Sequence, residues 1–179
     1  MNKEVLFRAK LKDWKANPEH NKWVEGFYLK RKETTYCFKE DYEKYPVKTL
    51  HFIAKEVMTD WGLPNDFRLY EIDPETLCET IGWSDSHKTK IFENDIVEFV
   101  SSSKKHSNKY LIWWNREMSL MSAIPLDDIS FNGSDYWNGH YPHFHYETFC
   151  VMLQDPWGDF SDIKVIGNII DNPELVKCS

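Results

Sequence analysis

The sequence predicts a mainly β protein with little helix, and two observations lead to this prediction. Aromatic residues make up 16% of the 179 residues, with eight Trp, nine Tyr and eleven Phe, and such side chains favour strands over helices. Short apolar or alternating runs recur along the chain between turn-forming residues, as they do in sheets and barrels. A chain of this length forms one domain or two small ones and can bury a core without disulfides or a metal.

The first region, residues 1–60, is expected to be a small β-rich part. Residues 23–31 form its clearest strand, because aromatic and branched side chains follow one another there. Residues 34–39 alternate between two faces, which predicts a second strand that pairs with 23–31 as a hairpin. Residues 48–60 fit a helix and a strand equally well, so both alternatives stay open.

Residues 61–94 are interpreted as a connector with one strand, Phe67–Ile72, followed by turns. Asp73-Pro74 ends that strand, since proline blocks the helical conformation before it and cannot donate to a ladder. Residues 91–179 form the last predicted domain, in which a long aromatic loop (130–160) is inserted. Its five short segments predict a small, strongly bent β-barrel; they are Ile96–Val100, Tyr110–Trp114, Glu117–Ile124, Phe149–Leu153 and Ile163–Ile170.

Charge, cysteines and hydropathy indicate a cytoplasmic protein without membrane contact. The net charge is −7, and residues 1–45 carry +3 while the rest carries −10. The four cysteines contain no C-x-x-C pair, so neither a disulfide framework nor a zinc ribbon is expected. The first residues lack the apolar stretch of a signal peptide, and no apolar run approaches the roughly 18 residues of a membrane span.

Catalytic motifs are missing from the sequence. There is no G-x-S-x-G elbow and no Cys–His signature, and neither phosphate-binding glycine pattern occurs among the seven glycines. Acidic residues in 127–128 and 155–162 follow from the acidic composition and do not by themselves indicate hydrolase chemistry. We therefore expect no enzymatic activity, no catalytic residues and no cofactor.

One loop, His140 to His145, carries weak metal candidates. His143, His145 and Glu147 alternate as they would on one face of a strand, and two imidazoles with a carboxylate could hold zinc or iron. The loop is rich in aromatic residues and lacks a supporting motif, so packing is the favoured interpretation and no metal site is assigned. A metal-dependent hydrolase that uses this loop remains an alternative function.

Aromatic residues in the last domain are the candidate interaction surface. Residues 110–114 are apolar on both faces, which predicts a strand that is buried twice or leaves one face for a partner. An exposed aromatic group would suit a protein interface or a stack of nucleic-acid bases. The residues that could form it are Trp113, Tyr136, Trp137 and Phe144.

The basic N-terminal strands supply another alternative, a nucleic-acid-binding module. This function requires one face that carries all of its cations: Lys10, Lys12, Lys30, Arg31 and Lys32. The acidic remainder of the chain would repel phosphate, so nucleic acid is not the favoured partner.

Three groups of residues together resemble the YopX family, small proteins carried by phages and prophages. The first is Phe7-Arg8-Ala9-Lys10, which resembles the family's opening strand, followed by Lys22-Trp23-Val24-Glu25-Gly26-Phe27-Tyr28, which resembles the family pattern W-V-x-G-aromatic. The second, which is the most specific, joins Tyr70-Glu71-Ile72-Asp73-Pro74-Glu75-Thr76-Leu77 and Ile81-Gly82 to Ile91-Phe92-Glu93-Asn94-Asp95-Ile96-Val97. The third is Val165-Ile166-Gly167-Asn168-Ile169-Ile170-Asp171-Asn172-Pro173-Glu174-Leu175.

The resemblance implies an SH3-like barrel in the C-terminal half and brings no established activity or cofactor. Asn94 replaces the family's glycine in E-G-D-I-V, and asparagine tolerates the left-handed backbone better than most residues. The turn at 86–89 lacks the family's glycine, so we expect a longer or differently shaped hairpin. Asp95 is expected to brace a turn, and residues 40–66 and 130–160 resemble insertions.

These observations favour a non-enzymatic phage or prophage accessory protein of the bacterial cytoplasm. It would act through contacts with a protein of the phage or the host, or with further copies of itself as a homo-oligomer.

Overall fold

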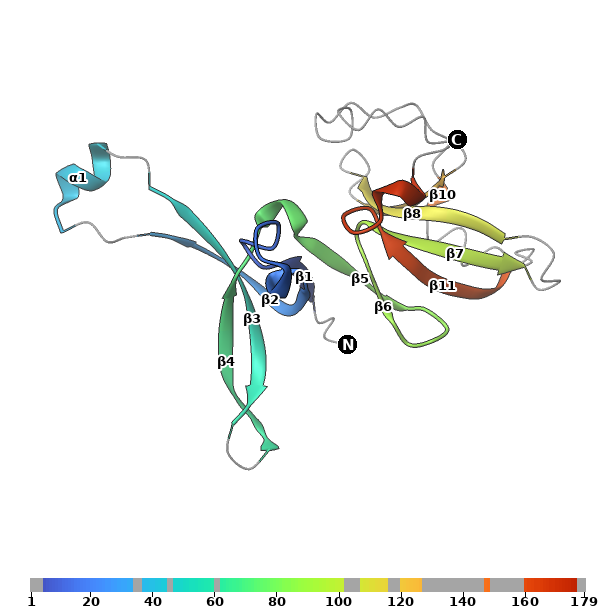
Figure 1. Cartoon of the computed structure of the whole chain (residues 1–179), viewed down its shortest axis with the longest axis horizontal. Coiled ribbons are helices and arrows are strands. Elements are labelled where there is room, and N and C mark those ends of the chain that lie inside the picture. Colours follow the sequence, from blue (N-terminus) through green and yellow to red (C-terminus); the bar gives the residue numbers. More distant parts are fainter. Residues whose placement is uncertain are drawn as a thin grey trace. The chain divides into compact units, whose positions relative to one another are not determined.

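The computed structural model describes residues 5–33, 37–44, 47–59, 62–101, 107–115, 120–126, 147–148 and 160–176 (Figure 1). The chain is mainly β, as predicted, and its described strands pair in antiparallel fashion. It divides into two compact units, residues 1–79 and 80–179, so the range 61–94 contributes to both.

The first unit contains a sheet of strands in the order β4-β3-β2-β1. Its strands are β1 (Phe7–Lys10), β2 (Trp23–Lys32), β3 (Thr49–Met58) and β4 (Pro64–Glu71). On its other edge β1 pairs with the first two residues of β5 (Cys78–Ser84). Of the two alternatives for residues 48–60, helix or strand, the strand is correct, because Thr49–Met58 forms β3.

The hairpin predicted between 23–31 and 34–39 is wrong. β2 pairs with β1 and β3 instead, and Lys39–Lys44 forms the short helix α1. Lys39 and Glu43 lie one helical turn apart with Nζ and Oε1 separated by 3.3 Å, a spacing that favours helix. Residues 37–39 are therefore not part of a strand, and residues 34–36 lie outside the described residues.

Gly26 is the point at which β2 changes its partner. Residues 23–26 pair with β1, and residues 27–32 pair with β3. A Cβ atom at Gly26 would overlap the carbonyl oxygen of Ala54 and lie 2.9 Å from its carbonyl carbon. The glycine therefore lets two backbones approach more closely than any side chain would permit.

One face of this sheet, which we call the core face, carries the buried apolar cluster of the first unit. Ala9, Val24, Ile53 and Ile72 are buried there, and Phe7, Leu11, Tyr28, Tyr70 and Leu77 pack against them. Alternate residues of β2, β3 and β4 point to the opposite face, the outer face. The two faces of the first sheet thus differ in burial, which matters for the candidate site.

The second unit contains a sheet in the order β10-β9-β8-β7-β11. Its strands are β7 (Asp95–Ser101), β8 (Ser107–Asn115), β9 (Leu120–Pro125), β10 (Glu147–Thr148) and β11 (Phe160–Asn168). Strand β6 (Lys90–Phe92) pairs with the later part of β5. The segment 149–153, predicted as a strand, lies outside the described residues. Within the described residues the sheet has two ends, β10 and β11, and is not a closed ring.

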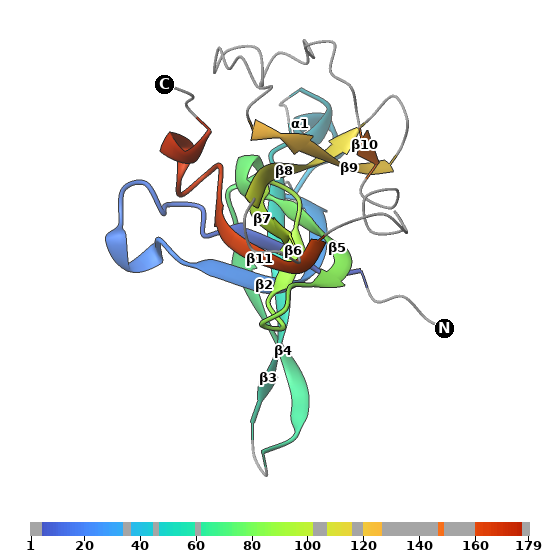
Figure 2. The same ribbon diagram turned by 90° about the vertical axis from the view of Figure 1, so that its right-hand side faces the viewer.

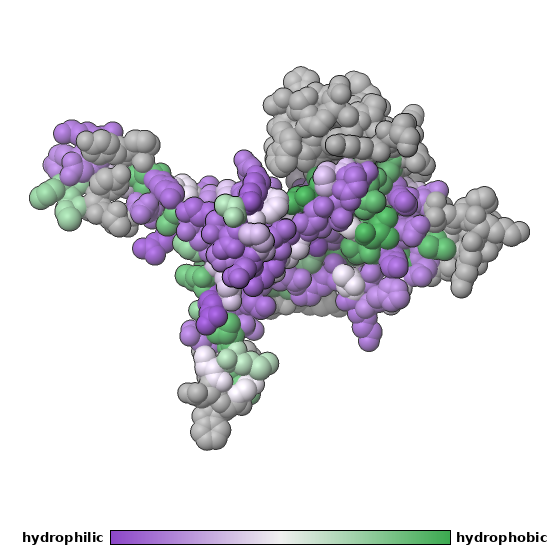
Figure 3. All heavy atoms as spheres, viewed as in Figure 1, coloured by the Kyte–Doolittle hydropathy of each residue, from purple (hydrophilic) through white to green (hydrophobic). Residues whose placement is uncertain are grey.

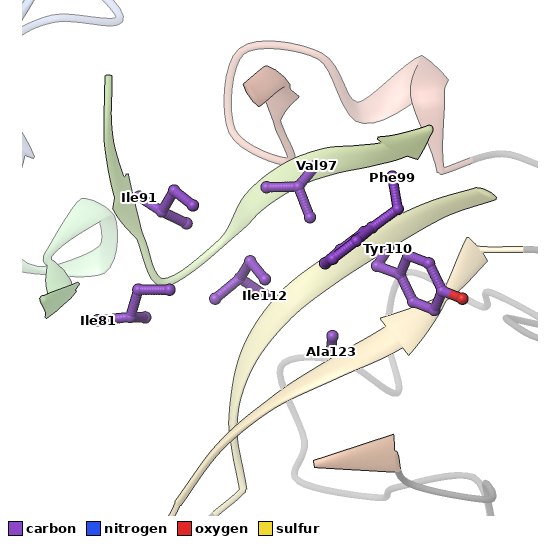
Figure 4. Close-up of a cluster of buried hydrophobic side chains, with 7 residues drawn as sticks. All are labelled: Ile81, Ile91, Val97, Phe99, Tyr110, Ile112 and Ala123. Atoms are coloured by element: carbon purple, nitrogen blue, oxygen red, sulfur yellow. The ribbon is translucent and has the colours of Figure 1, made fainter. Parts of the chain in front are cut away.

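Both faces of the second sheet are buried. One face holds Ile81, Ile91, Val97, Phe99, Tyr110, Ile112 and Ala123 (Figure 4). The other holds Ile96, Leu111, Ile124, Leu126 and Val176. Register explains this division, because Ile96, Leu111 and Ile124 lie opposite one another across β7, β8 and β9. Of the two alternatives for 110–114, burial on both faces therefore holds for Tyr110, Leu111 and Ile112.

The turn between β5 and β6 is fixed to β11 by two side chains. Asp85 Oδ1 accepts from the amides of His87 and Thr89 at 2.9 and 2.8 Å, and its Oδ2 accepts from Val165 at 3.1 Å. Ser86 and Ile163 exchange backbone and hydroxyl hydrogen bonds, and the Ser86 hydroxyl also contacts the Asp162 carboxylate. The edge strand β11 is thus covered beside residues 162–165.

Asn94 adopts the left-handed backbone that the sequence led us to expect, with φ 68°. The Asp95 carboxylate is buried and accepts from the Phe92 amide at 2.9 Å, so Asp95 braces the turn as predicted. Lys88 also has a positive φ of 66°. Lysine has therefore taken the conformation for which glycine would be preferred in this turn.

Lys88→Gly is expected to raise the free energy of unfolding by about 0.5 kcal/mol. Glycine removes the left-handed strain of a Cβ-bearing residue, and its greater freedom in the unfolded chain offsets part of the gain. Lys90→Gly, in strand β6, is the matched control and should be destabilising. Urea unfolding of the three proteins measures both effects, and equal losses for the two variants would contradict the assignment.

Candidate protein-contact surface

Trp113 is the one residue of the predicted interaction surface that the structure describes. It is half-buried and packs against the cluster of Ile96, Leu111, Ile124, Leu126 and Val176. Part of its side chain is therefore used in packing, and its role in an interaction surface stays a prediction. Tyr136, Trp137 and Phe144 lie outside the described residues.

The weak metal candidates are described only at one position. The backbone of Glu147 pairs with Ala123 in strand β10, whereas His143 and His145 lie outside the described residues. Within the described ranges no group of three or more His, Cys, Asp or Glu side chains is placed to hold a metal ion.

The basic residues of the nucleic-acid alternative do not share one face. Lys30 and Lys32 alternate with Arg31 along β2, which places Arg31 on the opposite face. Lys12 pairs with Glu71 at 2.5 Å, and this hydrogen bond raises the pKa of Lys12. Lys10 is buried. The single cationic face that this alternative requires is therefore not formed.

Lys10 takes part in a compact aromatic cluster at the β1 end of the outer face. Its Nζ donates to Asn21 Oδ1 at 2.7 Å and lies 4.8 Å from the Trp23 ring centre and 5.6 Å from that of Trp14. The Arg8 guanidinium lies 4.5 Å from the same Trp23 ring. The indole N–H of Trp14 donates to the Asp73 carboxylate at 3.0 Å. These contacts cover the outer face near β1. They also hold the cationic groups of Lys10 and Arg8 against the Trp23 ring.

The outer face of β2, β3 and β4 carries apolar side chains in register. Phe27, Ala54 and Leu69 lie opposite one another, and Leu29 lies opposite Phe52. The rings of Phe27 and Phe67 meet edge to face with centroids 6.3 Å apart. Cross-strand pairs of this kind stabilise a sheet even where one side faces water.

Much of this apolar surface is exposed to solvent. Leu29 is 45% exposed, Phe67 and Leu69 are each 54% exposed, and Met58 at the end of β3 is 72% exposed. Residues 55–58 of β3 pair with β4 beyond the last residue of β3 that β2 contacts, so this part forms a two-stranded ribbon (Figures 1 and 2). Hydrophobic residues are visible along the ribbon in Figure 3.

We call the surface formed by Phe27, Leu29, Phe52, Phe67 and Leu69 the outer apolar face. Single exposed apolar residues are ordinary, but a contiguous apolar group on one face of a sheet is typical of an interaction site. This surface was not among the predicted interaction residues. Residues 23–31 and 67–72 were predicted as strands, but a strand prediction alone does not say whether both faces of the strand are covered.

No helix among the described residues is long and apolar enough to cross a bilayer.

The comparisons with known proteins agree with the resemblance found in the sequence. No curated protein matches the chain significantly. The family described as YopX protein matches residues 7–177, which include both units and the outer apolar face. The chain therefore belongs to the YopX family.

Proposed function

We propose that this protein is a non-enzymatic accessory protein of phage or prophage type that acts through protein–protein contacts. The observation that carries the proposal is the outer apolar face. Its central side chains come from three adjacent strands, so a partner would meet a rigid surface and bind with little loss of side-chain freedom. Aromatic residues in such a patch are the side chains that contribute most to protein interfaces.

The charges near this face favour a protein partner over nucleic acid. Arg31 is the basic residue of β2 that shares the outer face, while Glu56 of β3 and Glu71 of β4 also lie on it. Mixed charges around an apolar centre resemble the rim of a protein interface. A phosphate backbone would instead be attracted by a cationic stripe.

The proposal includes an SH3-like barrel for the second unit and a bacterial cytoplasmic location. The hydrogen bonds that join Asp85 and Ser86 to β11 support the barrel, since they connect the β5–β6 turn to the edge of the five-stranded sheet. Ile81 and Ile91, from the same hairpin, pack into the core of that sheet. Such a barrel would serve as a scaffold, because this architecture supports many binding roles.

Leu29→Asp is expected to weaken the affinity for the partner by about tenfold or more, because burying a charge in the centre of an interface is costly. The measurement is a pull-down of tagged full-length protein from infected or lysogenic host lysate, with mass spectrometry before and after nuclease treatment. Val5→Asp is the matched control, since Val5 is 41% exposed and precedes β1.

We expect a stoichiometric protein that survives nuclease to be retained by the wild type and by Val5→Asp, and lost by Leu29→Asp. Recovery of partners only before nuclease would favour the nucleic-acid module instead. Equal retention by Leu29→Asp would show that the outer apolar face is not the contact.

A further inference from the structure

The outer edge of β4 offers backbone groups to another strand. Ile72 N–H donates to His51 O at 2.9 Å, and in an antiparallel ladder such bonded pairs recur at every second residue. Residues 66, 68 and 70 of β4 therefore direct their backbone groups toward β3. Phe67 and Leu69 direct theirs away from it, because they alternate with those residues.

Two further hydrogen bonds agree with this assignment. Glu71 O, which the alternation places on the outer edge, accepts from Lys12 N–H at 3.1 Å. The Phe67 N–H donates to the carboxylate of its neighbour Asp66 at 2.8 Å, as an amide that points away from β3 can. Leu11 forms an isolated antiparallel bridge with Ile72 just after β4, and within the part of the chain that the structure describes no strand pairs with the earlier residues of β4 on this side. An exposed edge of this kind is a template for strand addition.

We propose that a second copy of this chain pairs its β4 with this edge in antiparallel orientation, forming a two-fold symmetric dimer. In the proposed register Phe67 lies opposite Phe67 of the second copy, and the two residues exchange both of their backbone hydrogen bonds. Leu69 then lies opposite Asn65 of the second copy. Only a symmetric pairing joins an edge to the same edge of an identical chain, as closed dimers require.

Charge selects this register over its neighbours. The proposed pairing places Asp66 opposite Arg68 of the second copy, twice by symmetry. A shift of the second copy by two residues would place Arg68 opposite Arg68 or Asp66 opposite Asp66, and like charges directly opposite are unfavourable. Both side chains are exposed, so they are accessible for this contact.

The charges within one copy favour the same arrangement. Arg68 lies opposite Lys55 of β3, and this pair of like charges is mildly destabilising. In the proposed dimer, Asp66 of the second copy lies on the other side of Arg68 and would offset this repulsion between Arg68 and Lys55. In the pairing, Asp66 would release the Phe67 N–H to the second copy and contact the guanidinium instead.

The proposed dimer rests on the proposed function in one respect: the second copy is a protein partner that binds beside the outer apolar face, to which Phe67 and Leu69 belong. These two side chains would lie beside their counterparts from the second copy and extend the outer apolar face across the dimer. Leu29 lies on β2, away from the pairing edge, so the pull-down with Leu29→Asp tests the proposed function separately.

The experiment is sedimentation velocity of the purified full-length chain over a concentration series. Asp66→Arg should weaken dimerisation by roughly tenfold or more, because two attractive pairs become repulsive. Adding Arg68→Asp to that variant restores opposite charges in the same register and should restore the dimer. The control is the exchange Lys39→Glu with Glu43→Lys in α1, which should leave association unchanged.

If Asp66 protects the edge against pairing, the Asp66→Arg variant should not weaken dimerisation. If its carboxylate only shields the Phe67 N–H from other strands, Asp66→Arg would associate as strongly as the wild type or more strongly. That outcome, a wild type that stays monomeric at all concentrations, or a double variant that fails to recover would each overturn the proposal. Circular dichroism of every variant shows that the sheet is retained.

Discussion

Gly26→Ala is expected to lower the free energy of unfolding of the first unit by about 3 kcal/mol, at the upper end of what overpacking a core costs. The added Cβ would overlap the Ala54 carbonyl oxygen and lie 3.0 Å from the Ile53 side chain. Backbone must move to make room, and this backbone carries the pairing of β2 with β3. The change therefore acts on two strands and not on one side chain.

Urea unfolding measures the effect, with probes that report on each unit because two units need not unfold together. Gly62→Ala is the matched control. Gly62 has a φ of 68° and nothing within 4 Å of the added atom, so its cost is limited to about 1 kcal/mol of backbone strain. Equal losses for the two variants would contradict the close approach described at Gly26.

Asp85→Ala is expected to destabilise the second unit by about 3 kcal/mol at neutral pH. The carboxylate accepts three backbone N–H groups from His87, Thr89 and Val165, and leaving buried donors unsatisfied costs about 1–3 kcal/mol each, less where water can replace the lost partner. The variant also frees the β5–β6 turn from β11.

The stability that Asp85 contributes depends on pH. Burial by itself favours the neutral acid, but the hydrogen bonds from the Thr89, Val165 and His87 amides outweigh it and lower the pKa of Asp85 from its ordinary value of 3.8. A lowered folded-state pKa contributes stability that is fully present above the unfolded value and is lost as the pH falls through the folded value.

The difference in unfolding free energy between the wild type and Asp85→Asn should therefore be largest near neutral pH and shrink below pH 3.8. Urea unfolding at pH 7 and at several acidic values measures it. Glu174→Gln, at an exposed position, is the control. A difference that stays constant with pH would contradict the role of the carboxylate.

Local features of the fold were predictable because neighbouring residues determine them. The aromatic run at 23–31 formed β2, and Asp73-Pro74 ended β4, with Asp73 then accepting from the Glu75 amide at 3.1 Å. Asn94 took the left-handed turn because its side chain tolerates that backbone. These are short-range effects that a sequence displays directly.

Long-range features were not predictable in the same way. Nothing within residues 23–39 shows that β2 divides its pairing between β1 and β3, because the close approach of Gly26 to Ala54 joins segments far apart in sequence. The outer apolar face was missed for the same reason, since its exposure depends on which strands lie beside Leu29 and Leu69. Of the predicted surface, Trp113 alone lies within the described residues.

The pairing of β7 with β11 has a consequence for the synthesis of the protein. Residues 95–101 leave the ribosome some 60 residues or more before their partners at 160–168, and contacts between distant segments form late. Until β11 emerges, the nascent chain would expose one long side of β7 and leave the Val165 bond of Asp85 unmade. The first unit, which ends at residue 79, can fold earlier. A ribosome stalled before residue 160 should thus carry a protease-resistant first unit and a cleavable second one.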